Sequence, residues 1–513
     1  MTALPEQLSG QLSGQLPEQP SAPASGLGEL QALLQAELPA LLAGAPYTTY
    51  AQRPLPAAQE EPEVRVATAP RLLQLRMVER AEACWERLRE PSEEEWLGIF
   101  RRAGEALARR LEDTSGLEDR NGGCVLEPVA KRASRTSGLP HQRILRSWRT
   151  LTDTLLNLEG CLREQAPGRS LEAYRTGATG ASWRWLPAGR TVAVRIPGNS
   201  PTINVTWLQA LAARRPVLLN APDEDPFTAA LFALALQEAG LPAGALSLAY
   251  GDTPLFWQRA DQVVWPGDPP AELLRRGAAL RTYHQGRSKV ILGPGPRPKD
   301  FWHRLARMVV QGCGRLCTNA SSLVVASEDF GDAAAAGLEL AGALQRYPVL
   351  PLEDPAAIVP AFPDPQRRAA VAAMIEGALA RGARDLSHEA GAGPLGQEID
   401  GLAFLRPTVI LLEAGDPLFG AELPFPFVTV TAATPAQIPA LCRGSLITAP
   451  VGCDEDLAQV LALEPTVDKV FADEDFDHGY RPDEPHEGFL ADFLFHKKSV
   501  LAASAGPRGV EQR

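Results

Sequence analysis

Short apolar runs alternate with longer segments of helical periodicity from about residue 182 onward. Such runs, bounded by Gly, Pro and Asp, predict buried strands, and the segments between them predict helices. Strands that alternate with helices in this way predict a parallel sheet with right-handed crossovers. The expected strands are 190–198, 216–222, 246–252 and 261–268, and the expected helices are 202–215 and 226–240.

The loops that follow these strands form the expected ligand site. They begin at Pro197, Asn220, Gly251 and Pro266. Ligands of open parallel sheets bind outside the carboxyl ends of the strands. We therefore expect these loops to line one crevice.

The first part of the chain has a different pattern. Residues 71–111 place apolar side chains at helical spacing and predict at least two helices, with Ser92 as the N-cap of the second. Residues 27–42 predict an amphipathic helix. Residues 1–27 contain a polar QLSG repeat that is too poor in apolar side chains to bury a core, and they are expected to be mobile.

The composition is that of an ordinary soluble protein. Of the 513 residues, 45% are hydrophobic and 22% are charged, and this length suits two or three domains. The formal net charge of -12 argues against a nucleic-acid partner, which needs a clustered basic face. No stretch has the length and apolarity of a membrane span, and the N-terminus lacks the pattern of a secretory signal. The 7 cysteines are scattered, which suits reduced thiols in a cytoplasm.

Two of these cysteines, Cys313 and Cys317, lie four residues apart between an apolar helical run and an apolar strand. A thiolate is a strong nucleophile, but a cysteine between apolar runs is more often a small buried hydrophobe. A Cys-x-x-x-Cys redox or metal pair is a further alternative, which lacks other ligands at a suitable spacing. The residues alone leave these alternatives open.

The histidines give no metal signature, because none of them has the spacing of a HExxH or comparable ligand set. We expect no metal site, and we expect these histidines to be structural or exposed. This interpretation covers His284, His303, His388, His478, His486 and His496.

The chain has neither a G-x-G-x-x-G dinucleotide fingerprint nor a G-x-x-x-x-G-K phosphate loop. From about Pro128 to Val430 it nevertheless resembles the aldehyde dehydrogenase superfamily, and within it the fatty acyl-CoA reductases of the bacterial luminescence (LuxC-like) type. The order and spacing of several segments make this resemblance. They are IPGNSP at 196–201, DPFTA at 225–229, EAGLPAGALSLAYGD ending at Asp252, ADQVVWPGD ending at Asp268, GRLCT at 314–318, PTVI at 407–410 and ELPFPF at 422–427.

The resemblance implies an aldehyde dehydrogenase-like α/β fold. This fold has a Rossmann-type parallel-sheet cofactor domain, an α/β catalytic domain and a small oligomerisation arm, which implies a homodimer or homotetramer by analogy. The implied parts are an N-terminal extension at 1–60, partly disordered with one helix; a nucleotide cofactor-binding domain at 61–284, with the oligomerisation ribbon near 170–190; a catalytic domain at 285–470; and a C-terminal interface segment or tail at 471–513.

The resemblance also implies catalytic roles. Cys317 in GRLCT matches the family's nucleophile, and Asn199 in IPGNSP matches the oxyanion position, where such a donor contributes on the order of 3 kcal/mol. Tyr283 lies 34 residues before Cys317, where hydrolytic members have a glutamate that activates water. A phenol titrates at about pH 10 and is a poor base at neutrality. A thioacyl enzyme should therefore survive long enough to exchange with a thiol or to accept a hydride.

The implied cofactor is NAD or NADP. Asn220 replaces the family's lysine, and Asp223 matches an acidic position that accepts from the ribose hydroxyls and repels a 2′-phosphate, which favours NAD. The luminescence reductases favour NADPH as a group, so the choice stays open. Glu422 in ELPFPF matches the glutamate that bonds the nicotinamide ribose. The other implied cofactor-binding residues are Pro197, Gly251 and Gly267.

The implied reaction is the NAD(P)H-dependent reduction of an acyl thioester to an aldehyde through a thioacyl adduct on Cys317. The acyl donor would be acyl-CoA or an acyl-carrier protein. One alternative is the NAD(P)-dependent oxidation of an aldehyde to an acid, with water activated by a residue other than Tyr283. The other is a superfamily member without catalysis that acts as an assembly partner.

Overall fold

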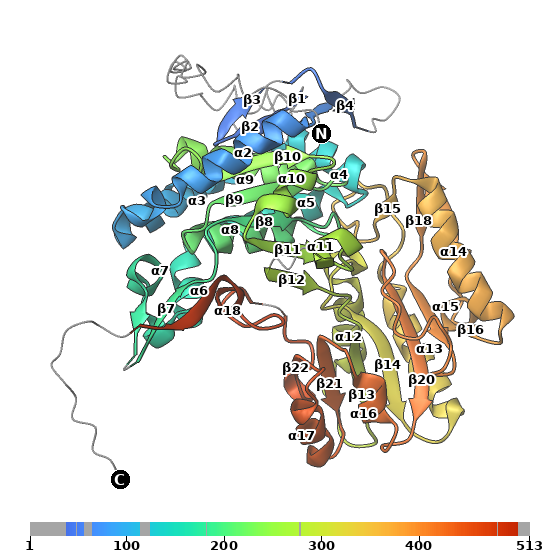
Figure 1. Cartoon of the computed structure of the whole chain (residues 1–513). Coiled ribbons are helices and arrows are strands. Elements are labelled where there is room, and N and C mark those ends of the chain that lie inside the picture. Colours follow the sequence, from blue (N-terminus) through green and yellow to red (C-terminus); the bar gives the residue numbers. More distant parts are fainter. Residues whose placement is uncertain are drawn as a thin grey trace, which may run out of the picture.

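Two seven-stranded sheets form the framework of the computed structural model (Figure 1). The structure describes residues 37–500, apart from 48, 56–63, 113–123, 181, 276–278 and 480. The mobility expected for residues 1–27 falls outside these described residues. In Figure 1 the first sheet lies in the blue and green part of the chain, and the second lies in the yellow and orange part.

The first sheet has the order β12-β11-β8-β9-β10-β2-β3. Strands β8 to β12 run parallel, whereas β2 is antiparallel to both β10 and β3. Every residue of β9 and β10 is buried, as expected for parallel strands that are covered on both faces. The four strands predicted after residue 182 are therefore confirmed as β8 to β11. The bounds are β2 Ala40–Leu42, β3 Ala45–Tyr47, β8 Val192–Arg195, β9 Val217–Ala221, β10 Leu246–Tyr250, β11 Gln262–Pro266 and β12 Ala279–Tyr283.

Helices cover both faces of this sheet, and local signals fix where they begin. Ser92, the predicted N-cap, forms a capping box, in which Ser92 N–H donates to Glu95 Oε2 at 2.8 Å and Glu95 N–H donates to Ser92 Oγ at 3.3 Å. Asp225 caps the next crossover helix by accepting from Thr228 N–H at 3.2 Å. The bounds are α2 Arg71–Cys84, α3 Glu93–Glu112, α4 Glu127–Ser137, α5 His141–Leu156, α6 Leu158–Gln165, α7 Glu172–Thr176, α8 Val205–Ala212, α9 Pro226–Glu238, α10 Pro254–Arg259 and α11 Ala271–Arg275.

The helix predicted over 27–42 is wrong in its described part. Residues 37–42 form β1 (Glu37–Leu38) and β2, and β2 pairs with β10 through Leu41 and Leu248. A short apolar run has no fixed preference between helix and strand, and here the open edge of β10 offers backbone partners. These residues extend the first sheet, so the described part of the 1–60 region is no separate extension. β1 also forms a small sheet with β5 (Arg65–Ala67) and β4 (Gln52–Pro54).

The second sheet has the order β16-β19-β20-β14-β13-β21-β22, and it is parallel except for β16. A three-stranded sheet, β15-β18-β17, lies beside it. The strand bounds are β13 Ser288–Leu292, β14 Ala320–Ala326, β15 Ala361–Phe362, β16 Arg384–Asp385, β17 Gly396–Ile399, β18 Leu402–Leu405, β19 Thr408–Leu411, β20 Phe427–Ala433, β21 Ile447–Val451 and β22 Lys469–Val470; the helix bounds are α12 Phe301–Val310, α13 Phe330–Leu344, α14 Pro365–Ala380, α15 Leu386–Glu389, α16 Ile438–Cys442 and α17 Glu455–Leu463.

After β22 the chain leaves the second sheet and returns to the first part of the protein (Figure 1). It forms α18 (Leu490–Leu494) and then β23 (Phe495–Ser499), which pairs with β7 (Trp183–Pro187). β7 also pairs with β6 (Ala178–Thr179), so a three-stranded arm occupies the region where the ribbon was expected. We call residues 471–494 the return segment, and it connects the second sheet with the arm.

Within the described residues, no helix combines the length and the apolar character that crossing a membrane requires.

Candidate active site

The order in which the chain adds strands to the first sheet reverses between β8 and β11, although these two strands are parallel. The chain continues from β8 to β9 and β10 on one side, and from β11 to β12 on the other. Ligands of α/β sheets bind outside the carboxyl ends of the strands at such a switch point. A cavity of about 960 Å³ lies here, lined by Arg195, Ile196 and Pro197 at the end of β8 and by Pro266 and Gly267 at the end of β11.

The expected crevice is therefore found in part. The loops after β8 and β11 line the cavity, whereas Asn220 and Gly251 are not among its lining residues. These two residues still lie together, because Asn220 Nδ2 donates to the carbonyl of Gly251 at 2.9 Å. The carboxyl ends of β9 and β10 are joined by this bond.

Cys317 also lines the cavity, on the loop between α12 and β14. Close backbone packing fixes this loop, because a Cβ on Gly286 would lie 1.9 Å from the carbonyl oxygen of Cys317. Only glycine tolerates that approach. Ser288 Oγ donates to the same carbonyl at 2.9 Å, which anchors the loop to β13.

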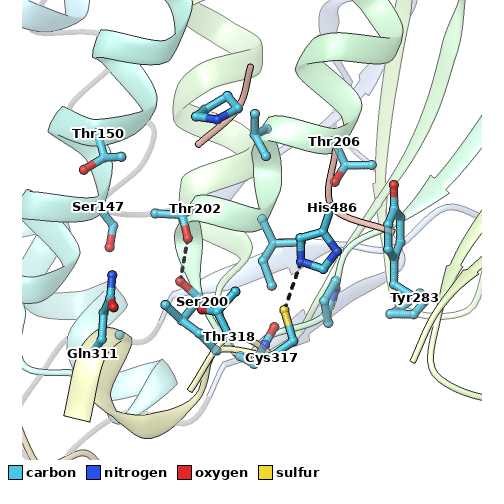
Figure 2. A pocket seen from close by; sticks show the side chains of 18 of the residues that line it. Ser147, Thr150, Ser200, Thr202, Thr206, Tyr283, Gln311, Cys317, Thr318 and His486 are labelled. Carbon is cyan, nitrogen blue, oxygen red and sulfur yellow. Dashed lines mark hydrogen bonds between the residues drawn. The ribbon is translucent and has the colours of Figure 1, made fainter. Parts of the chain in front are cut away.

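The thiol of Cys317 contacts an imidazole. Its Sγ lies 3.2 Å from Nε2 of His486, a residue of the return segment 169 positions further along the chain. Figure 2 shows the two side chains facing one another, with Tyr283 on the other side of the imidazole. Burial raises the pKa of Cys317 to about 12, and the nearby Glu422 and Glu487 contribute in the same direction. The resting group is therefore a neutral thiol.

His486 is held by its neighbours. Its ring packs edge-on against Tyr283 with 5.8 Å between ring centroids, and its Nδ1 lies 3.9 Å from Oε1 of Glu487. Burial lowers the pKa of His486 to about 3, and the positive charges of Lys469 and Arg281 lower it further. The imidazole is therefore neutral at rest, with Nε2 facing the thiol.

Asn199 connects the loop after β8 with the loop of Cys317. Its Nδ2 donates to the carbonyl of Arg315 at 2.8 Å, and the side chain lines the cavity. Arg315 in turn donates to the carbonyls of Pro424, Ser137 and Ala361 at 3.0, 2.7 and 2.8 Å. The amide nitrogen of Asn199 has a second hydrogen, which is the donor that an oxyanion role needs.

Tyr283 is the last residue of β12 and is half-buried in the cavity wall. Burial raises the pKa of its phenol, and the guanidinium of Arg281 lies 5.1 Å from the ring centroid. The phenol stays protonated at neutral pH, so it cannot take a proton from water there.

Two carboxyl groups lie near the thiol. Glu422 accepts from the backbone N–H of Arg287 at 2.7 Å and lines the cavity, and burial raises its pKa to about 7. Burial likewise raises the pKa of Glu487 to about 7. Each raises the pKa of Cys317 when it is ionised, so their charges oppose the formation of a thiolate.

Asp223, the acidic residue expected to select the cofactor, is not a free carboxylate. Asp223, after β9, forms an ion pair with Arg53 of β4, and both side chains are exposed. The preference for NAD assumed a free carboxylate that repels a 2′-phosphate. Arg53 offsets that charge, so the reasoning from Asp223 no longer separates NAD from NADP.

Cys313 lines the same cavity as Cys317 but is buried, whereas Cys317 is half-buried. Cys313 is 2% exposed, and burial raises the pKa of its thiol to about 11. No cluster of three or more His, Cys, Asp or Glu side chains able to hold a metal occurs among the described residues. These observations favour the interpretation of Cys313 as a packing neighbour.

The sequence analysis missed His486, which was expected to be structural or exposed. It lies in the polar segment RPDEPHEGF, and no spacing rule links it to a cysteine so far away. The replacement of the expected glutamate by Tyr283 was the available signal, because a missing base invites a search for another.

Comparisons with known proteins find that part of this chain is similar to members of the aldehyde dehydrogenase superfamily. A model of the aldehyde dehydrogenase family matches residues 55–259, which end before Cys317. Phenylacetaldehyde dehydrogenase of Pseudomonas fluorescens is 27% identical over 242 residues, which cover 44% of this chain and 46% of that protein. N-succinylglutamate 5-semialdehyde dehydrogenase of Caulobacter sp. (strain K31) is 29% identical over 153 residues, which cover 27% and 30%. The matched segments span less than half the length of these relatives.

Structural comparison extends the likeness to most of the chain. The NAD-dependent aldehyde dehydrogenase from Sinorhizobium meliloti aligns with a TM-score of 0.72 at 17% identity, covering 93% of this chain and 97% of that one. At this identity the likeness is evidence of fold alone. The expected aldehyde dehydrogenase-like α/β fold is confirmed.

Proposed function

We propose that this chain oxidises an aldehyde to a carboxylic acid, with NAD or NADP as the hydride acceptor and Cys317 as the nucleophile. The observation that supports this most is the position of the thiol in a cavity at the β8–β11 switch point, together with Asn199. The curated relatives are named as dehydrogenases of aldehydes, which supports oxidation over other reactions of the superfamily.

A dinucleotide would lie at the carboxyl ends of the strands of the first sheet. Pro197 and Gly267 line the cavity at two strand ends, and Gly267 has open space where a Cβ would stand, so a flat group can approach the backbone. Asn220 and Gly251 would hold the next part of the cofactor, and Glu422 would lie near the nicotinamide ribose. The bound cofactor would supply a hydride acceptor. Arg53 beside Asp223 is compatible with a 2′-phosphate as well as with a free ribose.

The residues of the chain have separate tasks in this proposal. The sulfur of Cys317 adds to the carbonyl carbon, and the amide of Asn199 and the Cys317 N–H hold the oxygen as it becomes negative. A bound cofactor would accept the hydride, and the sulfur of Cys317 would then hold a thioacyl group. Water then releases the acid, and this step needs a proton acceptor other than Tyr283.

Acyl-thioester reduction, the reaction implied first by the sequence, is the second candidate. It is favoured by Tyr283, whose phenol cannot activate water. Thioester chemistry would be favoured only where no other base lies close to the thioacyl group. His486 lies 3.2 Å from the sulfur, which argues against that condition and makes oxidation the better-supported reaction.

The experiment that tests the proposal measures reduced nicotinamide formed by the purified chain from a panel of aldehydes, with NAD or NADP and with or without CoA. We expect free acid as the product at a rate that CoA leaves unchanged. A rate that depends on CoA would support thioester chemistry instead. The chain could instead neither oxidise aldehydes nor reduce acyl thioesters, and bind neither NAD nor NADP. That result would favour the assembly-partner alternative.

Cys313→Ala is the matched control for Cys317→Ala in this assay. Only Cys317→Ala should lose turnover and the acyl adduct detected by mass spectrometry of the intact protein.

We also propose, as the sequence predicted, that the chain forms a homodimer or homotetramer through the arm and that it is cytoplasmic.

A further inference from the structure

We propose that His486 is the catalytic base of this site, and that it takes the proton of Cys317 during attack and later the proton of the hydrolytic water. The inference rests on the proposed function, and it assigns the role left open by Tyr283. It also gives the return segment a catalytic task.

The geometry supports a hydrogen bond from the thiol to the imidazole. The Sγ to Nε2 distance of 3.2 Å is short enough for an S–H donor and a nitrogen acceptor. If Nε2 accepts, the neutral ring has its hydrogen on Nδ1, which lies 3.9 Å from Oε1 of Glu487. The edge-on contact with Tyr283 keeps the ring in this orientation. Tyr283 would thus be a positioning residue.

The charges around the pair explain why proton transfer waits for the substrate. Lys469 of β22 and Arg281 of β12 disfavour a positive imidazole, whereas Glu422 and Glu487 disfavour a negative thiolate. The resting pair is a neutral S–H with a neutral imidazole. The proton moves when the sulfur adds to the aldehyde, because the new oxyanion then balances the imidazolium.

The proton inventory closes over the whole reaction. In the first step the S–C bond forms, the S–H proton moves to His486 Nε2, and the carbonyl oxygen becomes the oxyanion. A bound NAD(P)+ would accept the hydride, which would leave the thioester on Cys317, and the imidazolium of His486 would release its proton to solvent. A water then adds to the thioester carbon and gives one proton to Nε2. Collapse breaks the C–S bond, and the imidazolium returns a proton to the thiolate.

The carboxyl groups are the competing candidates. Glu422 is engaged by the N–H of Arg287 at 2.7 Å, and Glu487 faces the far side of the imidazole. Both make a thiolate harder to form. His486 is the group in hydrogen-bond contact with the sulfur, so it is the better assignment.

The test compares the full chain carrying His486→Gln with the full chain carrying His496→Gln. His496 is the matched control because it is an exposed histidine of β23, the strand that follows the return segment directly. The first readout is the rate at which iodoacetamide alkylates Cys317, followed by mass spectrometry of the peptide. It does not require aldehyde turnover. We expect a loss of roughly 10²-fold in His486→Gln, the usual contribution of a general base, and no change in His496→Gln.

A second readout is turnover with an aldehyde, measured in His486→Gly with and without added imidazole. Rescue by imidazole in a folded variant supports the assignment. Unchanged alkylation and unchanged turnover in His486→Gln would overturn it. A loss confined to Glu487→Gln or Glu422→Gln would also overturn it, in favour of a carboxylate base. If the unmodified chain oxidises no aldehyde while alkylation still depends on His486, the proposed function fails and the thiol–imidazole assignment stands.

Discussion

Replacement of Asn199 by alanine should separate catalysis from stability. The change removes one bond, from Nδ2 to the carbonyl of Arg315 at 2.8 Å, which contributes about 1 kcal/mol to the free energy of unfolding. It also removes the donor that would hold the oxyanion, which lowers turnover by roughly 10²- to 10³-fold, or about 2.7–4 kcal/mol in the barrier. Turnover should therefore fall far more than stability does.

A second asparagine of the same loop region provides the control. Asn204 is 2% exposed, donates to the carbonyl of Pro201 at 2.9 Å and accepts from Trp207 Nε1 at 2.7 Å. Asn204→Ala leaves a buried indole N–H without its acceptor, so the free energy of unfolding should fall by about 2 kcal/mol. Asn204 does not line the cavity, and turnover should change by less than about threefold.

The assay pairs steady-state turnover, followed by the absorbance of the reduced nicotinamide, with guanidinium unfolding of each variant. The two variants should show opposite patterns. If Asn199→Ala keeps turnover within about threefold of the unmodified chain, the oxyanion role is wrong and the residue only ties two loops together. The reasoning also fails if both variants lose turnover in proportion to their loss of stability.

Further predictions concern the thiols and the cofactor. Cys317→Ser should abolish turnover while Cys313→Ser retains most of it, and equal losses in two folded variants would indicate a paired-cysteine site. Because burial raises the pKa of Cys317 to about 12, its thiolate fraction at about pH 8 should be roughly 10³-fold below that of an ordinary thiol, and alkylation in His486→Gln, which lacks the assisting imidazole, should accelerate as the pH rises. A flat rate between neutral and alkaline pH would contradict this. Arg53→Ala should leave the charge of Asp223 without its partner and shift the ratio of NAD affinity to NADP affinity towards NAD by about tenfold, the equivalent of one hydrogen bond to a charged group. Fluorescence titration with both nucleotides measures this ratio. An unchanged ratio would exclude both residues from the cofactor site.

The strands of the first sheet were predictable because their environment is simple. Parallel strands covered on both faces need nearly continuous apolar runs, and VLLNA and LSLAY have them, with one polar residue each. The segment ELPALL was not predictable in the same way, because a short apolar run suits a helix or a strand, and its pairing with β10 was decided by tertiary structure. Local sequence patterns therefore predicted the strands of the sheet but not which strand β2 pairs with.

The candidate site shows the same division. Cys317 and Asn199 were found by their match to a family pattern, and the structure brings both to one cavity. His486 has no such pattern around it, since its significance lies in one contact across 169 positions of sequence. The pairing of Asp223 with Arg53 was equally hidden, because β4 lies far from β9 along the chain.

The order in which the cavity wall is synthesised follows from the path of the return segment. Pro482, Glu484, His486, Phe489 and Leu490 complete the wall, and the ribosome makes them after all of the strands of both seven-stranded sheets. A nascent chain could therefore pack both sheets while Cys317 faces bulk water without its imidazole. During that interval the thiol would be open to oxidants and electrophiles of the cell. Docking of the return segment would thus cover the thiol and, under the proposal, supply its base.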